Sequence, residues 1–97
     1  MVKYALLARV EAKAGKEDAV EQFLKSALPL AEEEKETISW YALKLGPSTF
    51  GIFDTFNEES GREAHLGGKI AAALMQHADE LLSKPPVIEK VELLAVK

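Results

Sequence analysis

The stretch TISWYALKLGPSTFGIFDTF, residues 37–56, decides the fold of this 97-residue chain. Its first half is dense in β-branched and aromatic side chains, which predicts a strand over Thr37–Leu45. A Gly-Pro-Ser turn follows, and Thr49–Phe56 then predicts a second strand that returns beside the first. The sequence therefore places a β-hairpin at the centre of the chain.

The segments on either side of this hairpin each combine one helical region with one strand. Val2–Ala12 alternates as a strand does, and apolar residues over Val20–Ala31 then recur at helical spacing. After the hairpin, a second helical region runs to Ser83, and Val87–Val96 predicts the last strand. The order β-α-β-β-α-β predicts one domain over residues 1–97 with a ferredoxin-like α+β fold. In that fold a four-stranded antiparallel sheet carries both helical regions on one face.

Proline, glycine and capping residues indicate where the helices of both helical regions begin and end. Pro29 lacks an N–H and crowds the preceding turn, so we expect a kink or a break near Ala27. The pair Gly67-Gly68 should interrupt or bend the second region. Asn57 can cap that region, and Ser60–Glu63 also has the form of a capping box.

Composition excludes several functional classes. The absence of cysteine excludes disulfide frameworks, thiolate nucleophiles and cysteine-based metal sites. The net charge of −4 argues against a nucleic-acid partner, because phosphate binding needs a basic stripe. No apolar run approaches the ~20 residues of a membrane span, and the alternating N-terminus does not resemble a signal peptide. We expect a cytoplasmic protein without a membrane partner, and we interpret the acidic run Glu32–Glu36 as a solvated helix end.

One face of the expected sheet has no helix to cover it. Ala5, Leu7 and parts of Val87–Val96 would lie on this helix-free face, and an exposed apolar face favours a protein partner. We therefore expect a homodimer in which two sheets pack against each other about a two-fold axis.

Three side chains with acid–base chemistry lie in and after the second strand of the hairpin. His65 is the candidate base, because imidazole titrates near neutral pH. Asp54 could orient His65, and Arg62 could stabilise an anionic oxygen. These three residues form the predicted catalytic group, in a pocket between the sheet and the helices. Flat walls for an aromatic substrate are expected from Trp40, Phe50 and Phe56.

Each of these residues also has a structural interpretation. His65 could satisfy backbone groups where the helix breaks, and Asp54 could form a structural ion pair with Arg62. Trp40 and Tyr41 are adjacent in a strand and point to opposite faces, so at most one of them lines the pocket. His77 lies on an apolar helical face and is interpreted as a core histidine.

With these features the chain resembles the antibiotic biosynthesis monooxygenase superfamily over nearly its whole length. The first strand ends in the turn Ala12–Glu17, the hairpin ends in Ile52–Phe56, and His65 follows in the second helical region. Members usually have Glu and Trp where this chain has Asp54 and Phe56. The resemblance implies a dimeric α+β barrel with a pocket in each protomer between the sheet and its own helices. It also implies oxygenation of a phenolic or anthrone-like ring with no metal or flavin.

Two functions remain open at this point. The first is a cofactor-independent monooxygenase that oxidises a small phenolic or quinol-type aromatic substrate. The second is a non-catalytic dimer that binds a small ligand or is associated with stress, which the departures at Asp54 and Phe56 favour. The haem-degrading branch is not expected, because Ala8 and Phe56 stand where that branch has Asn and Trp.

Overall fold

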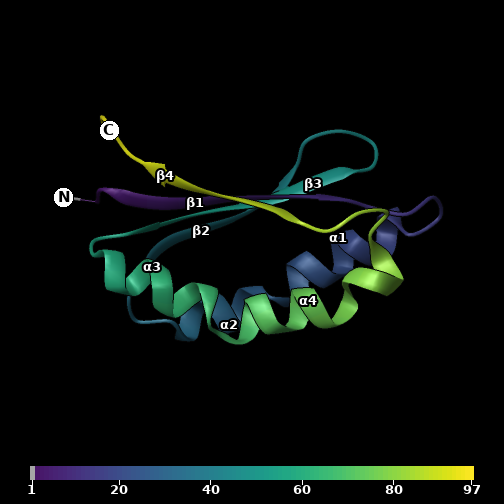
Figure 1. Cartoon of the computed structure of the whole chain (residues 1–97), viewed down its shortest axis with the longest axis horizontal. Coiled ribbons are helices and arrows are strands. Elements are labelled where there is room, and N and C mark those ends of the chain that lie inside the picture. Colours follow the sequence, from purple (N-terminus) through teal and green to yellow (C-terminus); the bar gives the residue numbers. More distant parts are fainter. Residues whose placement is uncertain (1) are drawn as a thin grey trace.

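The computed structural model describes residues 2–97 as a four-stranded antiparallel sheet with its helices on one face (Figure 1). The strands, in chain order, are β1 (Tyr4–Glu11), β2 (Thr37–Lys44), β3 (Thr49–Phe56) and β4 (Val87–Glu92). Their order across the sheet is β2-β3-β1-β4, with every neighbouring pair antiparallel. The predicted ferredoxin-like α+β fold is confirmed.

Each predicted helical region is divided into two helices, namely α1 (Glu17–Ser26) with α2 (Leu28–Glu33), and α3 (Glu59–Leu66) with α4 (Lys69–Leu81). The break expected near Ala27 is confirmed, because Pro29 lies in the first turn of α2, where a missing N–H costs little. The pair Gly67-Gly68 separates α3 from α4, also as expected. No helix within residues 2–97 is long and apolar enough to cross a membrane.

The predicted caps of the second helical region are wrong. Helix α3 follows Glu58 as its N-cap residue, and no side chain there makes a capping hydrogen bond. Ser60 lies inside the first turn of α3, and Asn57 precedes the N-cap, so neither residue occupies the capping position.

The strand register places three helix-facing residues in one row. Asp54 of β3 is opposite Leu6 of β1 on one side and opposite Trp40 of β2 on the other. The register of β2 shifts between Thr37 and Ser39, close to the start of that strand. Such an irregularity changes the direction of neighbouring side chains. It lies next to the connection between α2 and β2, which contributes to the site described below.

The hydrophobic core lies between the sheet and the helices. Val10 and Ile52 of the sheet pack with Val20 of α1 and with Leu74 of α4, and each is at most 6% exposed. His77 is half-buried at the edge of this core, where its ring meets Phe23 edge-on at a centroid distance of 5.6 Å.

The helix-free face of the sheet is uncovered in the single chain. Tyr41 and Phe53 stack on it with ring centroids 6.5 Å apart, and Tyr41, Leu45 and Val87 are each about half exposed. Leu7 lies beside Phe53 in the register, whereas Ala5 is fully buried. This face therefore presents a largely apolar surface to a partner.

Candidate functional site

The centre of the site is a histidine held between two carboxylates. His65 lies in the last turn of α3, and its Nε2 atom is 2.8 Å from Oδ2 of Asp54 on β3. Its Nδ1 atom is 2.6 Å from Oε1 of Glu34, the residue that ends α2. Glu34, Asp54 and His65 form what we call the His65 cluster. It joins β3 and α3, which are consecutive in the chain, to the end of α2, where Glu34 is 31 residues from His65.

The electrostatics of the cluster favour the charged imidazole. Burial lowers the pKa of His65, but the carboxylates of Asp54 and Glu34 raise it by more, to about 8. At neutral pH the ring is therefore mostly an imidazolium, with a proton on each nitrogen. Asp54 is 1% exposed, and within residues 2–97 neither of its oxygens has a hydrogen bond of good geometry. Its contact with His65 is thus a short, bent ion pair.

Glu34 is the member of the cluster that the sequence does not indicate. The run Glu32–Glu36 has the pattern of a solvated helix end, but the Glu34 side chain is only 21% exposed. Thr37 at the start of β2 donates a hydrogen bond of 2.7 Å to the same Oε1 atom that contacts His65. Nothing in the spacing of five consecutive charged residues distinguishes Glu34 from its neighbours. Only the chain reversal between α2 and β2 turns this one carboxylate inward.

A cleft of about 500 Å³ opens beside the His65 cluster. Its walls come from the end of α2, the connection to β2, helix α3 and the start of α4, and they include His65, Glu34, Thr37, Leu30, Ala64 and Lys69. Gly61 allows the close contact of α3 with the connection, since a Cβ there would lie 2.9 Å from Cβ of Glu36. The cleft is large enough for a small aromatic molecule.

A second, much smaller cavity lies between the sheet and the helices. Its volume is about 30 Å³, and Asp54 and His65 line it together with apolar residues such as Leu6, Ile52 and Ile70. His65 therefore lines both cavities. The pocket that the family resemblance implies between sheet and helices is nearly filled by side chains, and the larger open space lies at the α2–β2 end.

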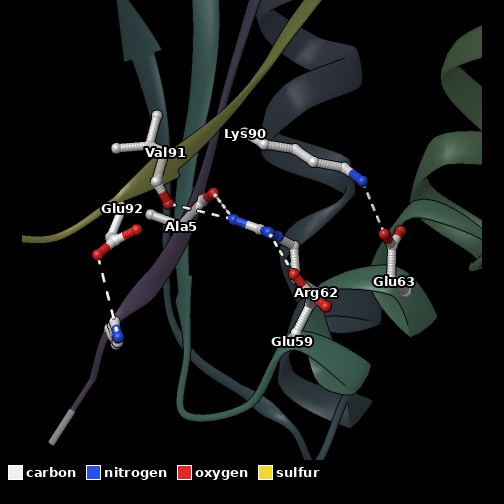
Figure 2. Close-up of polar contacts among 8 residues, drawn as sticks. Ala5, Glu59, Arg62, Glu63, Lys90, Val91 and Glu92 are labelled. Carbon is white, nitrogen blue, oxygen red and sulfur yellow. Dashed lines mark hydrogen bonds and ion pairs between the residues drawn. The ribbon is translucent and has the colours of Figure 1, made fainter.

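Arg62 does not join the His65 cluster, contrary to the sequence-based prediction. Figure 2 shows its guanidinium group reaching the sheet, where Nη1 is 3.4 Å from the carbonyl oxygen of Ala5 and 3.2 Å from that of Val91. Nη2 is 3.3 Å from Oε2 of Glu59. The alternative prediction of a structural ion pair between Asp54 and Arg62 is also wrong, because Asp54 pairs with His65 instead. Arg62 and His65 share one helix face, but the long arginine side chain extends to the β1–β4 side.

The three aromatic residues expected to bind substrate lie outside the lining of the 500 Å³ cleft. Phe56 is fully buried and packs against the His65 ring at a centroid distance of 5.6 Å, so it restricts the position of the imidazole. Phe50 belongs to the hydrophobic core. Trp40 lines a neighbouring groove of about 440 Å³ together with Glu34 and Thr37. Within residues 2–97 its buried indole N–H has no hydrogen-bond partner.

The cluster does not have the arrangement of a metal centre. Its two carboxylates bind opposite nitrogens of the imidazole ring, so the three side chains do not converge on one point. Across residues 2–97, no group of three or more His, Asp or Glu side chains is placed to hold a metal ion.

The sequence matches no family model and no curated protein, but the chain is similar to several solved structures. The crystal structure of the NE2512 protein of Nitrosomonas europaea, described as a protein of unknown function, is 64% identical in sequence. The match covers 100% of this chain and 94% of that one, with a TM-score of 0.98. The chain belongs to the NE2512 family.

Solved structures of much lower sequence identity have the same fold as the NE2512 family. A putative antibiotic biosynthesis monooxygenase from Nitrosomonas europaea is 13% identical, with a TM-score of 0.82, over 95% of this chain and 90% of that one. Another from Chloroflexus aurantiacus is 14% identical, with a TM-score of 0.73, over 98% of this chain and 96% of that one. The NE2512 family thus has the fold of this superfamily, as the resemblance in the sequence implied.

Proposed function

We propose that this chain is a cofactor-independent monooxygenase that oxidises a small phenolic or quinol-type aromatic substrate. The observation that supports this best is the position of His65, a buried imidazole between two carboxylates at the wall of a 500 Å³ cleft. The fold shared with putative antibiotic biosynthesis monooxygenases supports the same reaction class.

The chemistry assigned to His65 is proton removal. Neutral His65 accepts the proton of a substrate hydroxyl, and the resulting phenolate lies beside the imidazolium that has formed. The electron-rich phenolate then reduces dioxygen. One oxygen atom replaces a ring hydrogen, the other leaves as water, and the ring becomes a quinone. Because the pKa of His65 is raised to about 8, the fraction of neutral base, and with it the rate, should rise between pH 7 and pH 9.

Oxygen uptake by the purified, metal-stripped protein tests this proposal. A panel of phenols, quinols and anthrones is offered, and the product mass is determined for any substrate that consumes oxygen. We expect His65→Ala to reduce turnover by roughly 100-fold or more, the usual contribution of a positioned acid–base group. The matched variant His77→Ala removes the other histidine, which packs on Phe23 away from the cleft, and should retain activity. Equal turnover in the two variants would remove His65 from the mechanism.

A second candidate function is ligand binding without catalysis. Both nitrogens of His65 are occupied by carboxylates, and the interior cavity holds only about 30 Å³. In this case an aromatic ligand raises the unfolding temperature of the protein, and no oxygen is consumed. Detection of an oxygenated product from a bound ligand would exclude this function.

We also propose that two copies in the cytoplasm pair through the helix-free face. The support is the uncovered row of Leu7, Phe53 and Tyr41, together with the exposed Leu45 and Val87. Sedimentation should give a dimer at micromolar concentration, and Phe53→Glu should dissociate it, because the new charge would be buried in the interface. A monomer in the unsubstituted protein would refute the pairing. Cell fractionation tests the location, which the lack of cysteine supports.

A further inference from the structure

The two carboxylates that hold His65 differ in their access to the cleft. Asp54 is 1% exposed and lies within the strand β3, so its carboxylate is almost completely shielded from solvent. The Glu34 side chain is 21% exposed and lines the cleft, and it comes from the short connection between α2 and β2. Its sequence neighbours Glu33 and Lys35 are exposed. Glu34 therefore borders water at the cleft, whereas Asp54 lies inside the protein.

The second oxygen of Glu34 points toward another positive region. Oε2 lies 3.4 Å from the place where a Cβ of Gly68 would stand, immediately before helix α4 begins at Lys69. Among residues 2–97 no side chain makes a capping hydrogen bond to this helix, and its first turn contains no acidic residue. The free N–H groups and the dipole at a helix N-terminus attract anions. Lys69 adds a cationic side chain to the cleft lining.

The Glu34 carboxylate therefore lies between the His65 ring and the start of α4. The rest of the cleft lining is mixed in charge, with Lys35 and Lys69 on the positive side and Glu33 and Glu36 on the negative side. We propose that Glu34 is a placeholder for the ligand, and that the cleft binds an aromatic anion whose oxygen displaces Glu34 from Nδ1 of His65. The anion is a phenolate or an aromatic carboxylate, with its ring toward Leu30 and Ala64. This deepens the proposed function and rests on it only for the aromatic character of the ligand.

Displacement conserves the charge pattern of the site. Before binding, His65 lies between Asp54 and Glu34, and after binding it lies between Asp54 and the ligand oxygen. The imidazolium keeps both of its partners, so no buried charge is left unpaired. A neutral ligand with no acidic hydroxyl to transfer its proton to His65 offers no such replacement, and it would have to bind while Glu34 stays in place. The structure therefore favours anions over neutral molecules of the same shape.

The experiment measures the binding of benzoate and of benzamide, a neutral probe of nearly the same shape, by calorimetry. Glu34→Ala removes the placeholder, and we expect benzoate to bind roughly tenfold more tightly, as loss of a competing charge-assisted contact predicts. Benzamide affinity should change by less than about twofold. The matched variant Glu36→Ala removes the same charge from the same cleft but from a residue that does not contact His65, and it should alter benzoate affinity by less than about twofold.

Two further measurements complete the test. Glu34→Gln preserves the size of the side chain, so a gain in benzoate affinity there as well excludes an effect of altered packing. Benzoate should also shift the ¹⁵N resonance of His65 Nδ1 in the unsubstituted protein. The proposal is overturned if Glu34→Ala and Glu36→Ala act equally, if Glu34→Ala weakens benzoate binding, or if benzoate binds without affecting His65. Benzoate has no phenolic hydroxyl to oxidise, so a protein that fails to consume oxygen still gives a decisive result here.

Discussion

Raising the pH from 6 to 9 perturbs the His65 cluster through a single titration, and its effect on stability can be worked out from the structure. The pKa of His65 is about 8 in the folded protein, against 6.5 for an unperturbed histidine. The difference of about 1.5 corresponds to ~2 kcal/mol, at about 1.36 kcal/mol per pKa unit. Because the folded state binds the proton more tightly, this stabilisation is complete below pH 6.5. It decreases between pH 6.5 and pH 8 and is absent above that range.

Urea unfolding at a series of pH values measures this contribution. The free energy of unfolding of the unsubstituted protein is compared with that of His65→Gln, and the difference between them should be ~2 kcal/mol larger at pH 6 than at pH 9. His77→Gln is measured at the same pH values as the control for removal of a histidine outside the cluster. If the difference between the unsubstituted protein and His65→Gln were constant with pH, or larger at pH 9, the reasoning about the two carboxylates would be refuted.

Two further predictions concern the scaffold, and denaturant unfolding tests both. A Cβ at Gly51 would lie 2.6 Å from the carbonyl oxygen of Ala8 on the paired strand, so Gly51→Ala should cost about 1–3 kcal/mol. Gly46→Ala, whose nearest neighbour atoms would be 3.9 Å away, should cost less, and equal losses would contradict the argument. Leu74→Ala in the core should cost about 2–5 kcal/mol. Met75 is 59% exposed, so Met75→Ala should change the free energy of unfolding by no more than about 0.5 kcal/mol. Equal losses for Leu74→Ala and Met75→Ala would contradict this expectation.

The fold could be predicted from the sequence because its signals are local and agree with one another. The hairpin strand Thr49–Phe56 was predicted with the bounds that the structure has, and the helix breaks at Pro29 and Gly67-Gly68 follow from backbone chemistry. The last strand was predicted too long, since β4 ends at Glu92 and apolar residues continue beyond it. Alternation in the sequence does not distinguish a paired strand from an extended end.

The site was only partly predictable, because side-chain direction depends on contacts between distant segments. Proximity in the sequence predicts that Asp54 and His65 lie together, and the structure places Oδ2 of Asp54 2.8 Å from Nε2 of His65. The same proximity predicts that Arg62 joins them, but the long arginine side chain reaches the carbonyl oxygens of Ala5 and Val91 instead. Glu34 is far from His65 in the sequence and lies in a uniform run of charges. Only the fold shows that this one carboxylate turns inward.

The reach of Arg62 across to the sheet gives the last strand a role in shaping the site. Ala5 and Val91, whose carbonyl oxygens receive the guanidinium group, are register partners in β1 and β4. Helix α3 thus contains Arg62, which makes these contacts with the sheet, and one turn later His65. Through the carbonyl oxygen of Val91, the C-terminal strand therefore helps to fix the helix that positions the imidazole against its two carboxylates.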